Sequence, residues 1–219
     1  MSRPCGATFE SGLRIKADYE VSGPGGSRCV TTEETKWIQL ARKGDQAAFG
    51  RLVVTYQNAV YNLAYRMLDN PGEAENAAQE AFLRAYTHLR TYDPQRSFRT
   101  WLLSITSHYC IDLLRRRRLN WLPFKDEIAA PTPWLVNAPP NPESAVVQQE
   151  REEYIQQLLM ELSPTDRAAI ILHYWYDHPY KEIAETLELT VSAVKSRLYR
   201  ARRALAQAME GERECSVNK

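Results

Sequence analysis

The sequence has no apolar run of the length that a membrane span needs, which is about 18 residues. The segment Met1–Glu10 carries one arginine, and no apolar stretch followed by a small-residue cleavage site stands there, so no export signal is expected. We therefore predict a chain that does not insert into membranes and that resides in the cytoplasm.

Cysteine is scarce and scattered. The four cysteines are Cys5, Cys29, Cys110 and Cys215. They form no C-x-x-C pair, and none has a histidine at metal-ligand spacing, so the pattern predicts no metal site. A redox pair of Cys5 with Cys29 stays open, although a reducing cytosol disfavours it.

Features that would indicate an enzyme are also missing. The sequence has no glycine-rich phosphate loop and no nucleophile placed beside a base. The candidates for a helical enzyme would be His88, His108, His173 and His178 with nearby carboxylates, but a lone helical histidine is more often structural. We predict no catalytic residues and no cofactor.

No β-strand pattern competes with the helical periodicity, so the predicted fold class is all-α. Two small helical domains are expected, at residues 33–118 and 143–210. Residues 1–32 and 211–219 are predicted to be tails, and residues 119–142 a flexible proline-rich linker. The linker prolines are Pro123, Pro131, Pro133, Pro139, Pro140 and Pro142.

Three helices are expected in the first domain. Apolar residues at three- and four-residue steps predict a helix from about Asp45, its N-cap, to Leu68, and Asn70-Pro71-Gly72 would stop it. An alanine-rich stripe from Ala74 to Leu89 predicts the second helix. After the loop Thr91–Ser97, a third helix is expected at about 99–118, ending in four arginines.

The segment Leu162–Met209 has the pattern of a helix-turn-helix. Ser163 and Pro164 are residues that begin a helix, Ala184 is small where two helices must cross, and Thr190 is suited to cap the second helix. Buried contacts are expected from residues at the spacing this motif needs, namely Ile183, Ala184, Leu187, Leu189, Val194, Leu198 and Ala201.

Charge in this second helix is of one sign. Between Thr190 and Met209 it holds Lys195, Arg197, Arg200, Arg202 and Arg203 and no acidic residue. Such a helix fits against phosphates, and its N-terminal half, which presents Ser192, Lys195, Ser196 and Tyr199, would enter the major groove. The alternative is a solvated basic face. The helix cap, the small residue at the helix crossing and the one-sided charge all favour the same function, so we predict binding to double-stranded DNA. Replacing Lys195 and Arg200 with alanine should weaken that binding sharply.

With both domains laid out, the chain resembles the sigma-70 family of bacterial RNA polymerase subunits, in particular its extracytoplasmic-function type. Residues 162–209 resemble region 4 of that family, and residues 34–118 resemble region 2. The strings that carry the resemblance are Asp45–Phe49, Ala78–Leu83, Phe98–Leu102 and Ile111-Asp112 in the first domain, and Leu162–Pro164, Tyr180–Ala184 and Val194–Arg202 in the second.

The resemblance implies that the chain directs polymerase core to promoters. For the −35 element the implied residues are Ser192, Lys195, Ser196, Arg197, Tyr199, Arg200, Arg203 and His173. For the −10 element they are Arg96, Ser97, Phe98, His108, Asp112, Arg115 and Arg116; Phe98 is equally a core candidate. The core-docking face is implied at Glu75, Gln79, Glu80 and Leu83.

The implied partners are promoter DNA, the clamp helices of the largest polymerase subunit, the flap of the second-largest subunit, and an anti-sigma factor. Two residues depart from the family pattern: His108 stands where asparagine is common, and His173 where some relatives have arginine. The tail 1–32 is also longer than usual. The alternatives are a stand-alone helix-turn-helix activator and an anti-sigma or adaptor protein, but the latter would not explain the basic helix.

Overall fold

The computed structural model describes residues 32–119 and 142–217, and the regular structure in these two ranges is entirely helical. The first range forms α1 (Thr32–Arg42), α2 (Gln46–Leu68), α3 (Pro71–His88), the short 3-10 helix η1 (Leu89–Thr91) and α4 (Phe98–Leu119). The second forms α5 (Pro142–Met160), α6 (Pro164–Tyr174), α7 (Tyr180–Thr186) and α8 (Val191–Val217). The predicted all-α class is confirmed.

The helix boundaries in the first half follow from capping side chains. The Asp45 carboxylate accepts from the Ala48 backbone N–H at 3.1 Å, which begins α2. The segment predicted as a stop does more: Asn70 caps α3 by accepting from the Glu73 N–H at 3.0 Å, and Pro71 is the first helical residue. The chain therefore turns between antiparallel helices through Asp69, in the left-handed region, and Asn70.

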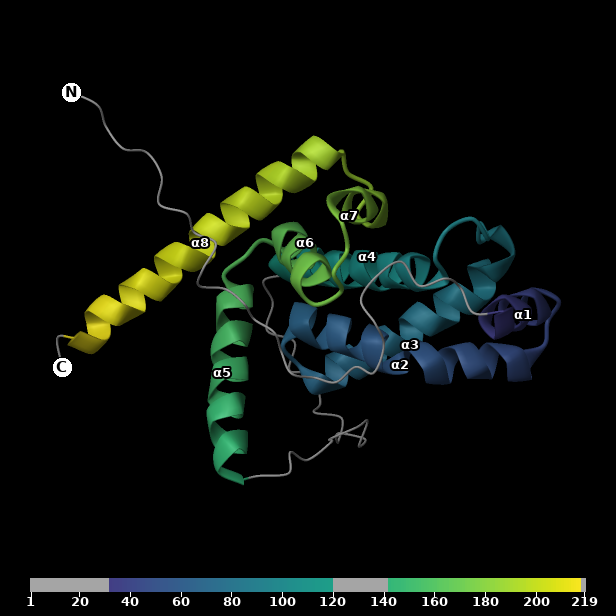
Figure 1. Cartoon of the computed structure of the whole chain (residues 1–219), viewed down its shortest axis with the longest axis horizontal. Helices are drawn as coiled ribbons and strands as arrows, with labels where there is room; N and C mark the ends of the chain where they lie inside the picture. The colour runs from purple at the N-terminus through teal and green to yellow at the C-terminus, as the bar shows by residue number, and fades with distance from the viewer. Residues whose placement is uncertain (1–31, 120–141, 218–219) are drawn as a thin grey trace.

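Small side chains set the spacing of the first half. Ala74, Ala77, Ala81 and Ala85 are fully buried, so α3 lies close against both α2 and α4. Figure 1 shows α2, α3 and α4 stacked along one another, with α1 across their far end. The predicted inner stripe of α3 is confirmed.

The helix-turn-helix is formed by α7 and α8. Ile183, Val194 and Leu198 are buried between these helices, and Thr190 Oγ1 accepts from the Ala193 N–H at 3.1 Å at the start of α8. Helix α8 extends to Val217, so residues 211–217 are helical and not a tail. A single glycine, Gly211, costs a helix only about 1 kcal/mol, which the good helix formers beside it offset.

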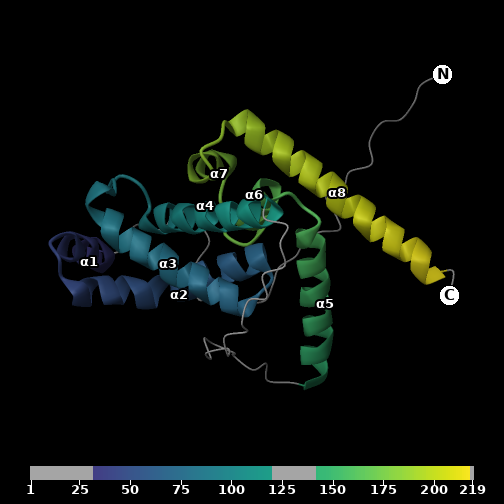
Figure 2. The ribbon, with the colours of Figure 1, turned by 180° about the vertical axis from the view of Figure 1, so that it is seen from behind.

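The two halves of the chain share one hydrophobic core. Two domains joined only by a flexible linker, as the sequence predicts, need no such shared core. Leu63 and Met67 of α2, Cys110 of α4, and Leu159 and Ile171 of the second half belong to a single buried cluster. Both views place α6 and α7 against α4, while α5 and the C-terminal part of α8 project outward (Figures 1 and 2).

Polar contacts also join the halves. The buried Arg167 guanidinium donates from Nη1 to the Met67 carbonyl, and the Tyr176 hydroxyl donates to the Ala59 carbonyl at 2.5 Å. Gln156 Nε2 donates to the carbonyls of Tyr65 and Arg66 at 3.2 and 3.3 Å. The predicted tail 1–32 and linker 119–142, and with them a Cys5–Cys29 pair, lie almost wholly outside the described residues.

Candidate nucleic-acid interface

The N-terminal half of α8 presents a polar and basic face. Ser192, Lys195, Ser196, Tyr199 and Arg203 are all exposed, and the Tyr199 side chain is 67% exposed. Their spacing of three and four residues puts them on the same side of the helix. The Ser196 hydroxyl donates to the Ser192 carbonyl at 3.1 Å, so its oxygen still has lone pairs to accept. These five predicted −35 residues are therefore brought together on an accessible surface.

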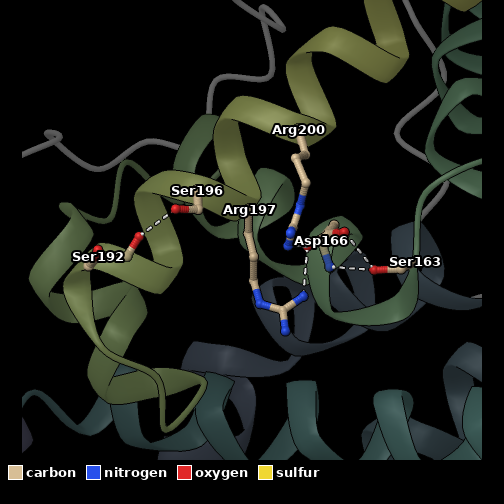
Figure 3. Close-up of polar contacts among 6 residues, drawn as sticks. All are labelled: Ser163, Asp166, Ser192, Ser196, Arg197 and Arg200. Carbon is tan, nitrogen blue, oxygen red and sulfur yellow. Dashed lines mark hydrogen bonds and ion pairs between the residues drawn. The ribbon is translucent and has the colours of Figure 1, made fainter.

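Two other predicted −35 residues turn toward α6. Arg197 Nη1 lies 2.9 Å from Asp166 Oδ1, and Arg200 Nη2 lies 3.9 Å from the same oxygen. Figure 3 shows both side chains pointing from α8 to the carboxylate, which also meets Ser163. The Arg197 side chain is only 28% exposed, so in this structure it ties the helix-turn-helix to α6.

His173, the eighth predicted −35 residue, is half-buried near the end of α6. Its Nδ1 lies 3.2 Å from the His178 carbonyl, which only accepts, so Nδ1 carries the proton. Its ring packs against Tyr174 and Tyr180, with centroids 4.9 and 5.2 Å apart. When the ring is neutral, Nε2 is left as an acceptor, whereas the arginine expected from the family pattern only donates.

Sequence reasoning missed the role of His178 in the break between α6 and α7. Its side chain is 4% exposed, and its Nδ1 has no hydrogen-bond partner among the described residues. Burial, helped by the positive charge of Arg99, lowers the pKa of His178 to about 4. The ring is therefore neutral at physiological pH; it lies edge-to-face with Tyr176, and its Nδ1 is 4.0 Å from Glu182 Oε2.

The predicted −10 loop is built around a buried tyrosine. Tyr92 donates its hydroxyl to the Arg96 carbonyl, and desolvation with nearby Glu34 and Asp93 raises the pKa of Tyr92 to about 12. Arg96 and Ser97 are exposed at the rim of this loop.

Phe98 differs from the predicted stacking face for a flipped base. It is 1% exposed, and its ring centroid lies 5.5 Å from those of Tyr56, Tyr92 and Trp101. In this structure an unstacked base therefore cannot reach Phe98. The alternative that the sequence left open, a core role, is what the packing supports, because Phe98 anchors the start of α4 beneath the loop.

The C-terminal half of α4 carries the other predicted −10 residues. His108 is half-buried, with Nδ1 2.9 Å from the Ser104 carbonyl. Asp112, Arg115 and Arg116 are exposed, and Arg115 Nη1 lies 3.9 Å from Asp112 Oδ1. The arginine run is not uniform, since Arg117 forms an ion pair with Glu73 of α3. Arg117 therefore joins two helices, and its neighbours remain accessible.

The predicted core-docking face lies on the outer side of α3. Glu75 accepts from Gln79 at 3.5 Å, and Glu80 pairs with Arg84 at 2.7 Å. The Leu83 side chain is 58% exposed, as its prediction as an anchor requires. Tyr86, one turn further on and edge-to-face with Phe49 at 4.9 Å, extends this apolar surface. Sequence reasoning missed Tyr86, although its i, i+3 spacing from Leu83 was a usable signal.

Both halves of the chain match models of known protein families. Residues 52–119 match the family model described as sigma-70 region 2, and residues 152–205 match that described as sigma-70, region 4. The chain is 38% identical over 180 residues to the ECF RNA polymerase sigma factor SigW of Bacillus subtilis, a match that covers 80% of this chain and 95% of that protein. It belongs to the extracytoplasmic-function (ECF) subfamily of sigma-70 factors.

Other ECF factors match over a similar span. The ECF sigma-E factor of Escherichia coli K12 is 30% identical over 172 residues, which cover 77% of this chain and 90% of that factor. The fold is that of the solved CnrH in complex with the cytosolic domain of CnrY, at a TM-score of 0.61 and 24% identity, covering 82% and 98% of the two chains. RpoE of Bartonella quintana, solved with the anti-sigma factor NepR, has a TM-score of 0.55 at 19% identity. This match covers 74% of this chain and 96% of the RpoE chain.

Metal-binding and membrane-spanning features are not found in the described parts of this ECF factor. Among the described residues, no group of three or more His, Cys, Asp or Glu is placed to hold a metal ion. In the same ranges, no helix combines the length and apolar character that crossing a membrane requires.

Proposed function

We propose that this ECF factor binds the RNA polymerase core and starts transcription at promoters that it selects through two contacts. Helix α8 reads the −35 element with Ser192, Lys195, Ser196, Tyr199 and Arg203. The observation that carries the proposal is the charge of α8, which has no acidic residue between Thr190 and Met209 and exposes its polar face. Serine and lysine at the start of a recognition helix suit base edges and phosphates.

The −10 contact is assigned to the loop before α4 and to α4 itself. Arg96 and Ser97 supply a charge and a hydrogen bond at the loop, and Arg115 and Arg116 supply phosphate contacts further along. His108, half-buried on α4 between Ser97 and Arg115, is assigned to the same −10 contact. Phe98 is omitted from the contact set because it is buried.

The outer face of α3, formed by Glu75, Gln79, Glu80 and Leu83, is assigned to dock on the clamp helices of the largest polymerase subunit. The half that contains α5 to α8 is assigned to the flap of the second-largest subunit. An exposed leucine among carboxylates combines an apolar anchor with charges that suit a basic partner. The factor acts in the cytoplasm and has no catalytic site of its own. An anti-sigma factor is its proposed inhibitor, by analogy with RpoE of Bartonella quintana, which was solved with one.

Binding both promoter elements at once requires the two halves to separate. The elements lie roughly 25 base pairs apart, or about 85 Å at 3.4 Å per pair. Helices α6 and α7 pack directly on α4, so the −35 and −10 surfaces belong to a single compact body in this conformation. The proposal is therefore that polymerase and DNA bind the separated arrangement, in which each half keeps its own modest affinity and the connection combines them.

The decisive experiment is run-off transcription with purified core polymerase and a library of promoter fragments, followed by mapping of start sites. We expect initiation that depends on the factor. The Lys195→Ala variant should abolish or greatly reduce this initiation. The other candidate, a stand-alone helix-turn-helix activator, would bind duplex but would not direct core enzyme by itself. Failure to initiate at any fragment would refute the proposal.

A further inference from the structure

Asp166 is an acidic residue whose carboxylate faces the basic recognition helix. It lies in the first turn of α6, where its Oδ2 accepts from the Ser163 hydroxyl at 2.8 Å. Its Oδ1 faces α8 and lies 2.9 Å from Arg197 and 3.9 Å from Arg200 (Figure 3). The Asp166 side chain is 16% exposed, so its interaction with the guanidinium groups is less screened than that of a surface pair.

The two arginines differ in what they can reach. Arg197 points to α6 and is largely covered, whereas the Arg200 side chain is 62% exposed at the edge of the face formed by Ser196 and Tyr199. Arg202, on the opposite flank, donates to the Tyr180 hydroxyl at 3.2 Å. Arg197, Arg200 and Arg202 of α8 therefore each have a side-chain partner. Among the described residues, Lys195 and Arg203 of α8 have none.

We infer that Asp166 is a positioning residue that limits how strongly α8 is attracted to DNA of any sequence. A carboxylate and a phosphate compete for the same guanidinium donors. While Asp166 holds Arg197 and restrains Arg200, fewer phosphates are neutralised than the number of cations on α8 suggests. Lower sequence-independent affinity favours specificity, which is the ratio of specific to non-specific binding. The inference rests on the proposed binding of α8 to duplex.

The test compares the salt dependence of binding, which reports the number of phosphates neutralised. Full-length protein is titrated into a short fluorescent duplex of random sequence from about 50 to 300 mM salt, and the slope of log K against log[salt] changes by about 0.9 per phosphate neutralised. Asp166→Asn keeps the shape and an oxygen that can accept from the Ser163 hydroxyl, but removes the charge. We expect its slope to become steeper by about 0.9 to 1.8, since one or two more phosphates are neutralised.

Matched variants separate positioning from folding. Asp166→Glu keeps the charge and should restore the wild-type slope, and Ser163→Ala removes the cap of α6 without changing charge, so it should lower the melting temperature and leave the slope unchanged. In the wild-type background, Arg200→Ala should flatten the slope much less than Lys195→Ala does. In the Asp166→Asn background, the two alanine variants should flatten the slope by equal amounts. The wild-type part of this comparison changes only exposed side chains, so it stands even where Asp166→Asn lowers stability.

Each outcome decides a separate point. A wild-type slope in Asp166→Asn, or a shallower one, would overturn the inference while leaving duplex binding by α8 intact. Equal losses from Arg200→Ala and Lys195→Ala in the wild-type background would overturn it as well. No binding of wild-type protein to any duplex would instead refute the proposed function, and with it this role of Asp166.

Discussion

Single residues decide how the recognition helix is presented. Lys195 and Arg203 are exposed on the same face of α8, whereas Arg197, in the same basic stretch, is committed to Asp166. Residue type alone would count all these cations as DNA contacts. Their accessibility and partners divide them into groups that meet solvent and groups that hold helices together.

Lys195→Ala should weaken binding to every duplex and reduce the salt slope by about 0.9, because one phosphate contact is lost. Fluorescence anisotropy at several salt concentrations measures both quantities. Lys181→Ala is the matched control, since Lys181 lies on α7 outside the recognition face. An equal loss in both variants would mean that Lys195 contributes only to general charge.

His178 makes stability depend on pH. Its pKa is about 4 in the folded protein and about 6.5 when unfolded, so the unfolded state binds more protons between these values and stability falls as pH drops through this window. Between about pH 7 and pH 5 we expect a loss of about 2 kcal/mol in the free energy of unfolding, measured by urea titration.

The control for this effect is His178→Gln, which does not titrate and should show a smaller difference between the two pH values. A wild-type difference as small as that of the variant would show that the His178 ring accepts a proton as readily in the folded protein as in the unfolded chain.

At the scale of elements, α3 has two faces with separate tasks. Its alanine face packs against α2 and α4, and its outer face presents carboxylates with Leu83 and Tyr86. The buried alanines hold the outer face on a rigid support, so substitutions on the proposed docking face leave the alanine core untouched.

Leu83→Ala should weaken binding of the polymerase core by about tenfold, because an exposed apolar anchor contributes on the order of 1–2 kcal/mol when it is buried at an interface. Pull-down or competition with core enzyme measures this loss. Binding to isolated duplex should not change, and Leu40→Ala, an exposed leucine of α1, serves as the control. Parallel loss of core and duplex binding would point to misfolding.

Boundaries of elements are predictable where local chemistry decides them. Residue type and position predict Asp45, Ser163 and Thr190 as helix caps, and each accepts the backbone N–H that capping requires. The C-terminal end of α8 was not predicted, because Gly211 is a weak signal that a long regular helix overrides.

At the scale of the molecule, the packing of the two halves is the main structural finding. Tyr176 illustrates it: the ring is buried, Arg99 of α4 lies 5.3 Å from its centroid, and its hydroxyl donates to Ala59 of α2. Residues more than a hundred positions apart are thus joined by a hydrogen bond that exists only while the halves are in contact.

Tyr176→Phe should shift the protein toward the separated arrangement, because it removes this hydrogen bond, worth about 1 kcal/mol, and keeps the ring. The radius of gyration from small-angle scattering should rise, and the salt dependence of duplex binding should stay as in wild type. Thr55→Val, which removes a hydroxyl that bonds within α2, is the control. An unchanged radius in Tyr176→Phe would show that the Tyr176 hydroxyl is not needed to hold the halves together, and that apolar burial with the Arg167 and Gln156 hydrogen bonds suffices.

The sequence by itself determined the all-helical class, helices α2 to α4, the helix-turn-helix and the one-sided charge of α8, because periodicity, capping and residue type are local properties. Only the tertiary structure decided which of those cations are accessible, that Phe98 is core, and that α6 and α7 pack on α4. These outcomes depend on Asp166, Tyr92 and Ala59, whose proximity to their partners arises from the folded chain and has no local signature.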